Sequence, residues 1–170
     1  MSSNVRLVSL KVLDDNGYGS SWHVAKAMDM AVDIGVNIVS ISLGYSSDGL
    51  LRKPFKAASD EGALDIQDTL QVSSFSNYGD YVDIAAYGAG VYIGNNMSAF
   101  GTSYACPLVS GALAILLAMG VKPKYAAGII TYNVDRFASP LRPLKKNAGA
   151  LNPLKAVKMV IDYPVLRGAH

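Results

Sequence analysis

The chain has 170 residues, of which 51% are hydrophobic and 16% are charged, with a mean hydropathy of +0.24. This length suits one domain, and the apolar balance excludes a disordered chain. The net charge of +2 excludes the strongly basic surface that binds nucleic acid or anionic membranes. The single cysteine, Cys106, excludes an intrachain disulfide framework and a metal site built from several cysteines, and we expect no metal or cofactor.

The first part of the chain predicts a parallel β-sheet. Residues 5–13 and 37–43 are rich in valine, isoleucine and leucine, which indicates strands buried on both faces. Residues 21–35 between them show helical periodicity. The polar side chains of this helix form one stripe: His23, Lys26, Asp29 and Asp33. Strand, helix and strand in this order form a βαβ unit, so we expect the two strands to be adjacent and parallel.

Helices dominate the remainder of the chain. We expect a short strand at residues 81–86, a glycine-rich loop after it, and helices at residues 51–61, 103–119, 124–132 and 153–161. The most apolar run, residues 108–120, is too short to span a bilayer. The first residues lack the apolar region of a signal peptide, so we expect a soluble chain without a targeting segment.

Residues 101–107 (Gly-Thr-Ser-Tyr-Ala-Cys-Pro) form the most informative stretch. Ser103 opens a strongly apolar helix, and Gly101 before it lets the backbone turn and a substrate come close. A helix start offers unpaired N–H groups and the positive end of the helix dipole, which suit a developing oxyanion. Two interpretations stay open at this point: Ser103 is a nucleophile, or a serine or threonine here caps a core helix.

Residues 101–111 resemble the nucleophile motif of the subtilisin-like serine proteases (subtilases), in which Gly-Thr-Ser-x-Ala-x-Pro opens a central helix. Other segments resemble the same family in the same order: residues 8–20, 37–44, 74–79, 82–86 and 148–157. The resemblance implies an α/β fold, a partial parallel-sheet three-layer sandwich, with residues 1–170 as one incomplete peptidase domain. It implies Ser103 as the nucleophile of a serine endopeptidase and a secreted or luminal location. It also implies a set of residues that bind an extended peptide or protein substrate: Ser42, Leu43, Gly44, Gly101 and Thr102.

The sequence departs from the subtilase pattern at the two partners of the serine. In the family an aspartate and a histidine precede the substrate-edge strand, within Asp-Thr-Gly or Asp-Ser-Gly and within His-Gly-Thr, and this sequence contains none of these motifs. Its histidines are His23, on the polar helix stripe, and His170, at the last position. Asp14 and Asp15 belong to a predicted turn. We therefore expect this chain to be inactive on its own.

A second departure lies between Leu64 and Asp65. At this point the family has a strand leading to Ala-Ala-Gly-Asn, whose asparagine contributes to the oxyanion hole, then a wall of the specificity pocket and another strand. Here Leu64 passes directly to polar residues, with family-like sequence on both sides, which indicates an internal deletion such as a skipped exon or a mis-joined gene model. No spacing favours Lys11 or Lys122 as a substitute base. We expect uncovered apolar helix faces and an insoluble or molten chain.

Three functions remain open. The first is a fragment of a subtilase endopeptidase that carries Ser103 and is inactive alone. The second is a pseudoprotease that keeps its edge strand to bind extended peptides or a partner, and the intact motif around Ser103 favours the first over it. The third is a nucleotide-binding α/β module using the loop at residues 16–20, which lacks both phosphate-binding glycine spacings.

Overall fold

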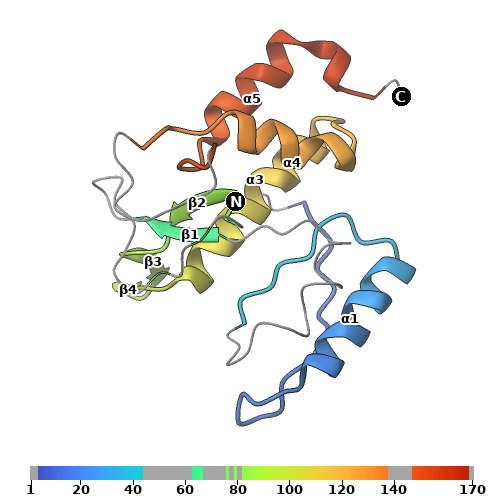
Figure 1. Cartoon of the computed structure of the whole chain (residues 1–170), viewed down its shortest axis with the longest axis vertical. Coiled ribbons are helices and arrows are strands. Elements are labelled where there is room, and N and C mark those ends of the chain that lie inside the picture. The colour runs from blue at the N-terminus through green and yellow to red at the C-terminus, as the bar shows by residue number, and fades with distance from the viewer. Residues whose placement is uncertain are drawn as a thin grey trace.

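The central element of the fold is helix α3 (Thr102–Ala118). The computed structural model describes residues 4–43, 63–66, 76, 79, 82–137 and 147–168. Within them, α3 packs against strands β1 (Ala63–Ile66) and β2 (Ile84–Tyr87) and against helices α4 (Pro123–Tyr132) and α5 (Pro153–Asp162) (Figure 1). The predicted helix at residues 51–61 lies outside the described residues.

Strands β1 and β2 are parallel, as expected for a βαβ-type sheet, with Leu64 opposite Ala85. The pairing continues on the other edge of β2, because Ala85 donates its N–H to Gly149 O (2.9 Å) and accepts from Leu151 N (2.7 Å). β1 runs through Asp65 and Ile66, so the change to polar residues after Leu64 does not end the strand. Asp65 has a partner in β2, and backbone pairing is not lost because a side chain is polar.

The two N-terminal strands predicted from the sequence do not form. Residues 5–13 and 37–43 are neither strands nor paired with each other, so the prediction of adjacent parallel strands is wrong. Leu7 is 89% exposed, whereas a strand buried on both faces requires it to be covered. An apolar segment becomes a strand only when a neighbour accepts its hydrogen bonds, and local sequence does not supply that neighbour.

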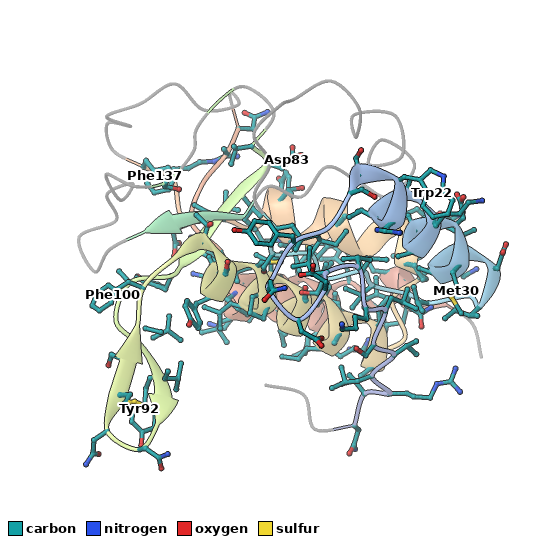
Figure 2. The ribbon with its side chains drawn as sticks, turned by 90° about the horizontal axis from the view of Figure 1, so that it is seen from below. Trp22, Met30, Asp83, Tyr92, Phe100 and Phe137 are labelled. Carbon is teal, nitrogen blue, oxygen red and sulfur yellow. The ribbon has the colours of Figure 1, made fainter. Side chains whose placement is uncertain are left out.

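Helix α1 (Ser21–Asp33) confirms the predicted first helix. It begins where the Ser20 side chain accepts a hydrogen bond from the backbone N–H of His23 (3.3 Å). The predicted polar stripe is exposed throughout: His23, Lys26, Asp29 and Asp33. Its buried residues are few: Val24, Met28 and Ala31. The predicted apolar remainder is only partly covered, since Trp22 and Met30 point away from the body of the protein (Figure 2).

The three C-terminal helices match the predicted ones within two residues. Prolines occupy the first turn of α4 and α5, where the missing N–H costs no hydrogen bond. The main core lies between α3, α4, α5 and β2. Its most buried large side chains come from three of these elements: Ile84, Leu116 and Val160. A short 3₁₀ helix, η1 (Pro164–Leu166), follows α5.

The predicted glycine-rich loop is instead a β-hairpin. Strands β3 (Val91–Gly94) and β4 (Met97–Ala99) are antiparallel and joined by Asn95 and Asn96, whose φ angles are 50° and 57°. Two consecutive residues of positive φ make the tight turn whose twist matches a hairpin, and asparagine tolerates this conformation. The hairpin projects from the body, with Tyr92 in its outer part and Phe100 at its base (Figure 2).

Candidate functional site

Ser103 is the second residue of α3 and is exposed to solvent. The helix begins after Gly101, which acts as N-cap without any side-chain hydrogen bond. The alternative that a serine or threonine caps this helix is therefore wrong, and the Ser103 hydroxyl is not used to begin the helix. Gly101 has a φ of +145°, a conformation that side-chain-bearing residues rarely adopt, so the turn into the helix requires glycine.

Backbone hydrogen bonds fix this turn. Gly101 donates its N–H to Gly88 O (2.8 Å), which ties the start of α3 to the base of the β3–β4 hairpin. Tyr104 donates to Gly101 O (2.9 Å) and closes the first turn. The N–H groups of Thr102 and Ser103 precede this first intrahelical hydrogen bond and carry the positive end of the helix dipole. Such a helix start favours negative charge.

Ser42 lies against the same turn. Its hydroxyl donates a hydrogen bond to the backbone carbonyl of Ser103 (3.2 Å). Ser42 is exposed and Leu43 is half-buried. The structure thus brings together Ser42 and Ser103, which the sequence assigned to substrate binding and to catalysis, although they are separated by 61 positions. Gly44 lies outside the described residues.

Cys106 makes a second contact with this segment. Its half-buried thiol donates to the carbonyl of Ile41 (3.4 Å) and lies 3.5 Å from the hydroxyl of Ser40. Three successive residues, 40–42, therefore contact the first two turns of α3. This contact was not predicted, because the sequence gives Cys106 no pattern that links it to residues 40 and 41.

No base accompanies Ser103 in the part of the chain that the structure describes. The imidazole of His23 lies on α1, with its Nδ1 3.1 Å from the hydroxyl of Ser20, so the expectation of a solvated helix residue is confirmed. Asp14 accepts hydrogen bonds from the N–H groups of Asn16 and Tyr18 (both 2.9 Å), as a turn aspartate does. His170 lies outside the described residues.

The other candidate bases are also accounted for. Lys11 pairs with Asp15 (2.8 Å), and both side chains are exposed. Lys122 precedes α4, beyond the C-terminal end of α3. Because α3 has 17 residues, it is about 25 Å long at 1.5 Å per residue, and Ser103 and Lys122 are at its opposite ends.

Among the described residues, the pKa of Asp135 is shifted, and Asp135 lies away from Ser103, between α4 and α5. Hydrogen bonds from Lys155 (2.6 Å) and Asn152 (2.9 Å) to the carboxylate of Asp135 lower its pKa below the usual 3.8. Asn152 also begins α5, where its side chain accepts from Lys155 N (3.0 Å). This cluster ties the residues after α4 to the start of α5, which is a structural task.

Two further classes of site find no support in the described residues. Among them, no group of three or more histidine, cysteine, aspartate or glutamate side chains is arranged to hold a metal ion. None of the helices there is long and apolar enough to cross a membrane.

Several known proteins are similar to this chain in sequence. A family model described as the subtilase family matches residues 57–129. A thermophilic serine proteinase of Bacillus sp. (strain AK1) is 31% identical over an alignment of 153 positions that covers 71% of this chain and 38% of that protein. Halolysin of Haloferax mediterranei is 33% identical, with 69% of this chain and 29% of halolysin covered. Thermitase of Thermoactinomyces vulgaris is 28% identical, and the alignment covers 89% of this chain and 65% of thermitase.

Solved structures give the same fold. The prenylagaramide maturation protease PagA aligns with a TM-score of 0.65 and 22% identity, covering 91% of this chain and 70% of that one. The self-cleaved protease domain of PatA aligns with a TM-score of 0.67 and 22% identity, covering 88% and 71%. The fold is therefore a partial α/β domain of the subtilisin type, as expected from the sequence. The chain belongs to the subtilase family, and it spans less than two thirds of the length of these curated relatives.

Proposed function

We propose that this chain carries the nucleophile and part of the peptide-binding face of a subtilase serine endopeptidase, and that it does not hydrolyse peptides on its own. In the complete endopeptidase, with a base supplied from outside the described residues, the hydroxyl oxygen of Ser103 attacks the carbonyl carbon of the scissile peptide bond. An ester bond forms between serine and substrate while the C–N bond breaks, and the serine proton passes through a base to the departing amine. Water then releases the acyl group.

One observation carries the proposal: the Ser103 hydroxyl is exposed in the first turn of α3 and takes no part in capping it. An exposed hydroxyl can approach a substrate carbonyl without any rearrangement of the core. In this proposal the N–H groups of the same turn face the oxyanion of the attacked carbonyl, and such groups lower the barrier by about 3–4 kcal/mol per donor.

The predicted lack of activity follows from the surroundings of Ser103. A serine hydroxyl is a weak nucleophile at neutral pH until a base removes its proton. Within the described ranges, neither a histidine nor a carboxylate is hydrogen-bonded to Ser103. In subtilisin itself, loss of the nucleophile or its base lowers the rate by about 10⁶-fold.

The substrate in this proposal is a peptide in extended conformation. Its backbone pairs with residues 42–44, and its scissile bond lies over Gly101 and Thr102 beside Ser103. The contact between Ser42 and the first turn of α3 supports this placement, since it brings the binding segment next to the nucleophile. An extended peptide exposes the hydrogen-bonding groups that such a segment needs.

The test is reaction of the purified chain with a fluorophosphonate, followed by intact mass and peptide mapping. We expect no labelling in buffer, and slow labelling of Ser103 that increases with added imidazole, because imidazole supplies the missing base from solution. Ser103→Ala abolishes this labelling. The matched control is Ser110→Ala, which removes the next serine along the same helix and leaves the labelling intact.

Two results would contradict the proposal. Rapid stoichiometric labelling of Ser103 without imidazole shows that the chain holds its own base, so the prediction of inactivity fails. Absence of labelling at every imidazole concentration shows that Ser103 is not an accessible nucleophile, so its catalytic assignment fails.

A second candidate function is a pseudoprotease that binds extended peptides without cleaving them. The engagement of His23 with Ser20 on α1 favours it, because the described histidine already has another contact. A peptide-binding measurement beside the labelling separates the two candidates: peptide binding without imidazole-dependent labelling of Ser103 supports the pseudoprotease.

A further inference from the structure

Helix α3 contains a break in its hydrogen bonding at Ser103. In an α-helix the carbonyl of each residue accepts a hydrogen bond from the N–H four residues later. For Ser103 that residue is Pro107, which has no N–H to donate. The carbonyl of Ser103 therefore lacks the donor that an α-helix normally provides four residues later.

The hydroxyl of Ser42 supplies the missing donor, at 3.2 Å from the carbonyl oxygen of Ser103. One turn further along the helix, the thiol of Cys106 donates to Ile41 O at 3.4 Å. The two hydrogen bonds run in opposite directions, one from the segment to the helix and one from the helix to the segment. They hold two successive residues of the segment against two successive turns of α3.

We propose that Ser42 and Cys106 are positioning residues that dock residues 40–43 on α3, and that Pro107 makes this docking possible by leaving the Ser103 carbonyl open. The docking contacts are the hydrogen bonds from Ser42 Oγ to Ser103 O and from Cys106 Sγ to Ile41 O. The role in substrate binding rests on the proposed function, in which residues 42–44 bind the peptide. The docking contacts then set the distance between the bound peptide and Ser103.

The surroundings of the segment give the docking contacts their importance. Residues 37–43 are not part of a sheet in the structure, so no ladder of backbone hydrogen bonds fixes their place. Ile38 packs against the main core and anchors the segment at one end. Beyond it, Ser42 and Cys106 provide the contacts that are directed at the helix carrying Ser103.

The first experiment measures docking without any peptide. Cys106 is the one cysteine of the chain, so the rate of its reaction with dithionitrobenzoate reports how often the docked segment opens. Ser42→Ala removes one hydrogen bond, and we expect the thiol to react roughly fivefold faster. The matched control is Thr131→Ala, which deletes a hydroxyl that bonds to Ala127 O (3.0 Å) within α4 and leaves the rate unchanged.

Pro107→Ala tests the role of the proline. Alanine supplies an N–H that takes the Ser103 carbonyl into the helix ladder, so the Ser42 hydroxyl loses its acceptor and the thiol again reacts faster. Adding Ser42→Ala to Pro107→Ala changes the rate little further, because the contact is already lost. This non-additivity distinguishes docking from two unrelated effects on stability.

The second experiment measures binding of fluorescein-labelled casein, an unfolded protein rich in extended segments, by fluorescence anisotropy. We expect Ser42→Ala and Cys106→Ala to weaken binding severalfold. Cys106→Ser keeps a donor at the same position and restores most of the affinity. A purely structural role predicts instead that binding follows the melting temperature, without rescue by serine.

The outcomes separate this proposal from the proposed function. Equal thiol reactivity in the unaltered chain, Ser42→Ala and Pro107→Ala overturns the docking. Faster thiol reaction with unchanged casein affinity in Ser42→Ala overturns the positioning role. Failure of the unaltered chain to bind casein counts against the proposed function alone, and the thiol rates then still decide the docking.

Discussion

The two ends of the described chain differ in how well their apolar side chains are covered. Residues 82–137 and 147–168 bury a connected core around α3, in which Ile84, Leu116 and Val160 are at most 1% exposed. Residues 4–43 bury only three hydrophobic side chains, all on α1, while Leu7 is 89% exposed. Figure 1 places α1 and α5 far apart, with α3 between them.

The two residues of the candidate site, Ser103 and Ser42, therefore differ in the packing that holds them. Ser103 stands on a helix enclosed by strands and helices, so the core fixes its backbone. Ser42 comes from the poorly covered part and meets α3 through the docking contacts. The predicted uncovered helix face is seen at Trp22 on α1, whereas the exposure of Leu7 contradicts the buried strand predicted for residues 5–13. The two halves of the site therefore rely on different amounts of packing.

The largest expected effect comes from comparing two leucines, one buried in the core and one exposed near the N-terminus. Leu116→Ala removes a side chain that is 1% exposed, and we expect the free energy of unfolding to fall by about 2–5 kcal/mol through lost burial and a cavity. Leu7→Ala changes it by less than about 0.5 kcal/mol. Urea unfolding measures both, and equal losses would contradict the contrast.

Two glycines in the packed C-terminal part differ in how much space surrounds them. A Cβ at Gly149 lies 2.6 Å from Cγ2 of Val134 and 2.7 Å from Asp135 O, so Gly149→Ala forces the backbone strands apart and costs about 1–3 kcal/mol. Gly128 in α4 has open space around it, and Gly128→Ala stabilises the helix by about 0.5–1 kcal/mol. Thermal unfolding compares the two, and a stable Gly149→Ala chain would show that this junction is loose.

Removing the N-cap side chains of α5 and α1 compares how much each cap stabilises the C-terminal and the N-terminal part. Asn152→Ala removes the α5 cap and the hydrogen bond to Asp135, at an expected cost of about 1–2 kcal/mol. Ser20→Ala removes the longer cap contact of α1 together with the exposed contact to His23 Nδ1, at about 0.5 kcal/mol. Circular dichroism during urea unfolding reports both. A larger loss for Ser20→Ala would place more of the stability in the N-terminal part.

The smallest expected effect is a dependence on pH. Because the folded pKa of Asp135 is lowered, its ion pair stabilises the protein above the ordinary value of 3.8, and this stabilisation is lost as the pH falls through the folded value. Asp135 is 40% exposed, so Asp135→Asn costs under about 1 kcal/mol at pH 7 and nothing once the pH is well below the folded pKa. Asp15→Asn, which breaks the more exposed pair with Lys11, has no measurable effect at either pH. A pH-independent cost of Asp135→Asn would contradict the assignment.

The helices could be predicted from the sequence because their signals are local. Apolar periodicity together with Ser20, Pro123 and Asn152 at the helix starts marks α1, α4 and α5 within one or two residues. Strands depend on partners that are distant in the chain, and so residues 5–13 and 37–43 were predicted wrongly. The β3–β4 hairpin was missed because its glycines suggested a loop, although the two asparagines at its turn carry a hairpin signal.

The candidate site was predicted in part. The motif at residues 101–107 singled out Ser103, and the resemblance to subtilases assigned Ser42 to substrate binding. The structure adds that the Ser42 hydroxyl donates to the Ser103 carbonyl. The contact of Cys106 with Ile41 was not predicted, because a thiol and a distant carbonyl share no sequence pattern. The open carbonyl of Ser103 could have been found, since Pro107 follows it by four positions. The deletion between Leu64 and Asp65 stays a prediction, and β1 is continuous across that point.

Amide hydrogen exchange followed by mass spectrometry tests most directly whether the nucleophile stands on a packed core beside a poorly covered N-terminal part. We expect peptides from α3 to exchange slowly, with a protection close to the global free energy of unfolding. Peptides from residues 5–13, which form no strand, exchange near the rate of an unfolded chain. Equal protection of the two segments, or rapid exchange throughout α3, would contradict the account.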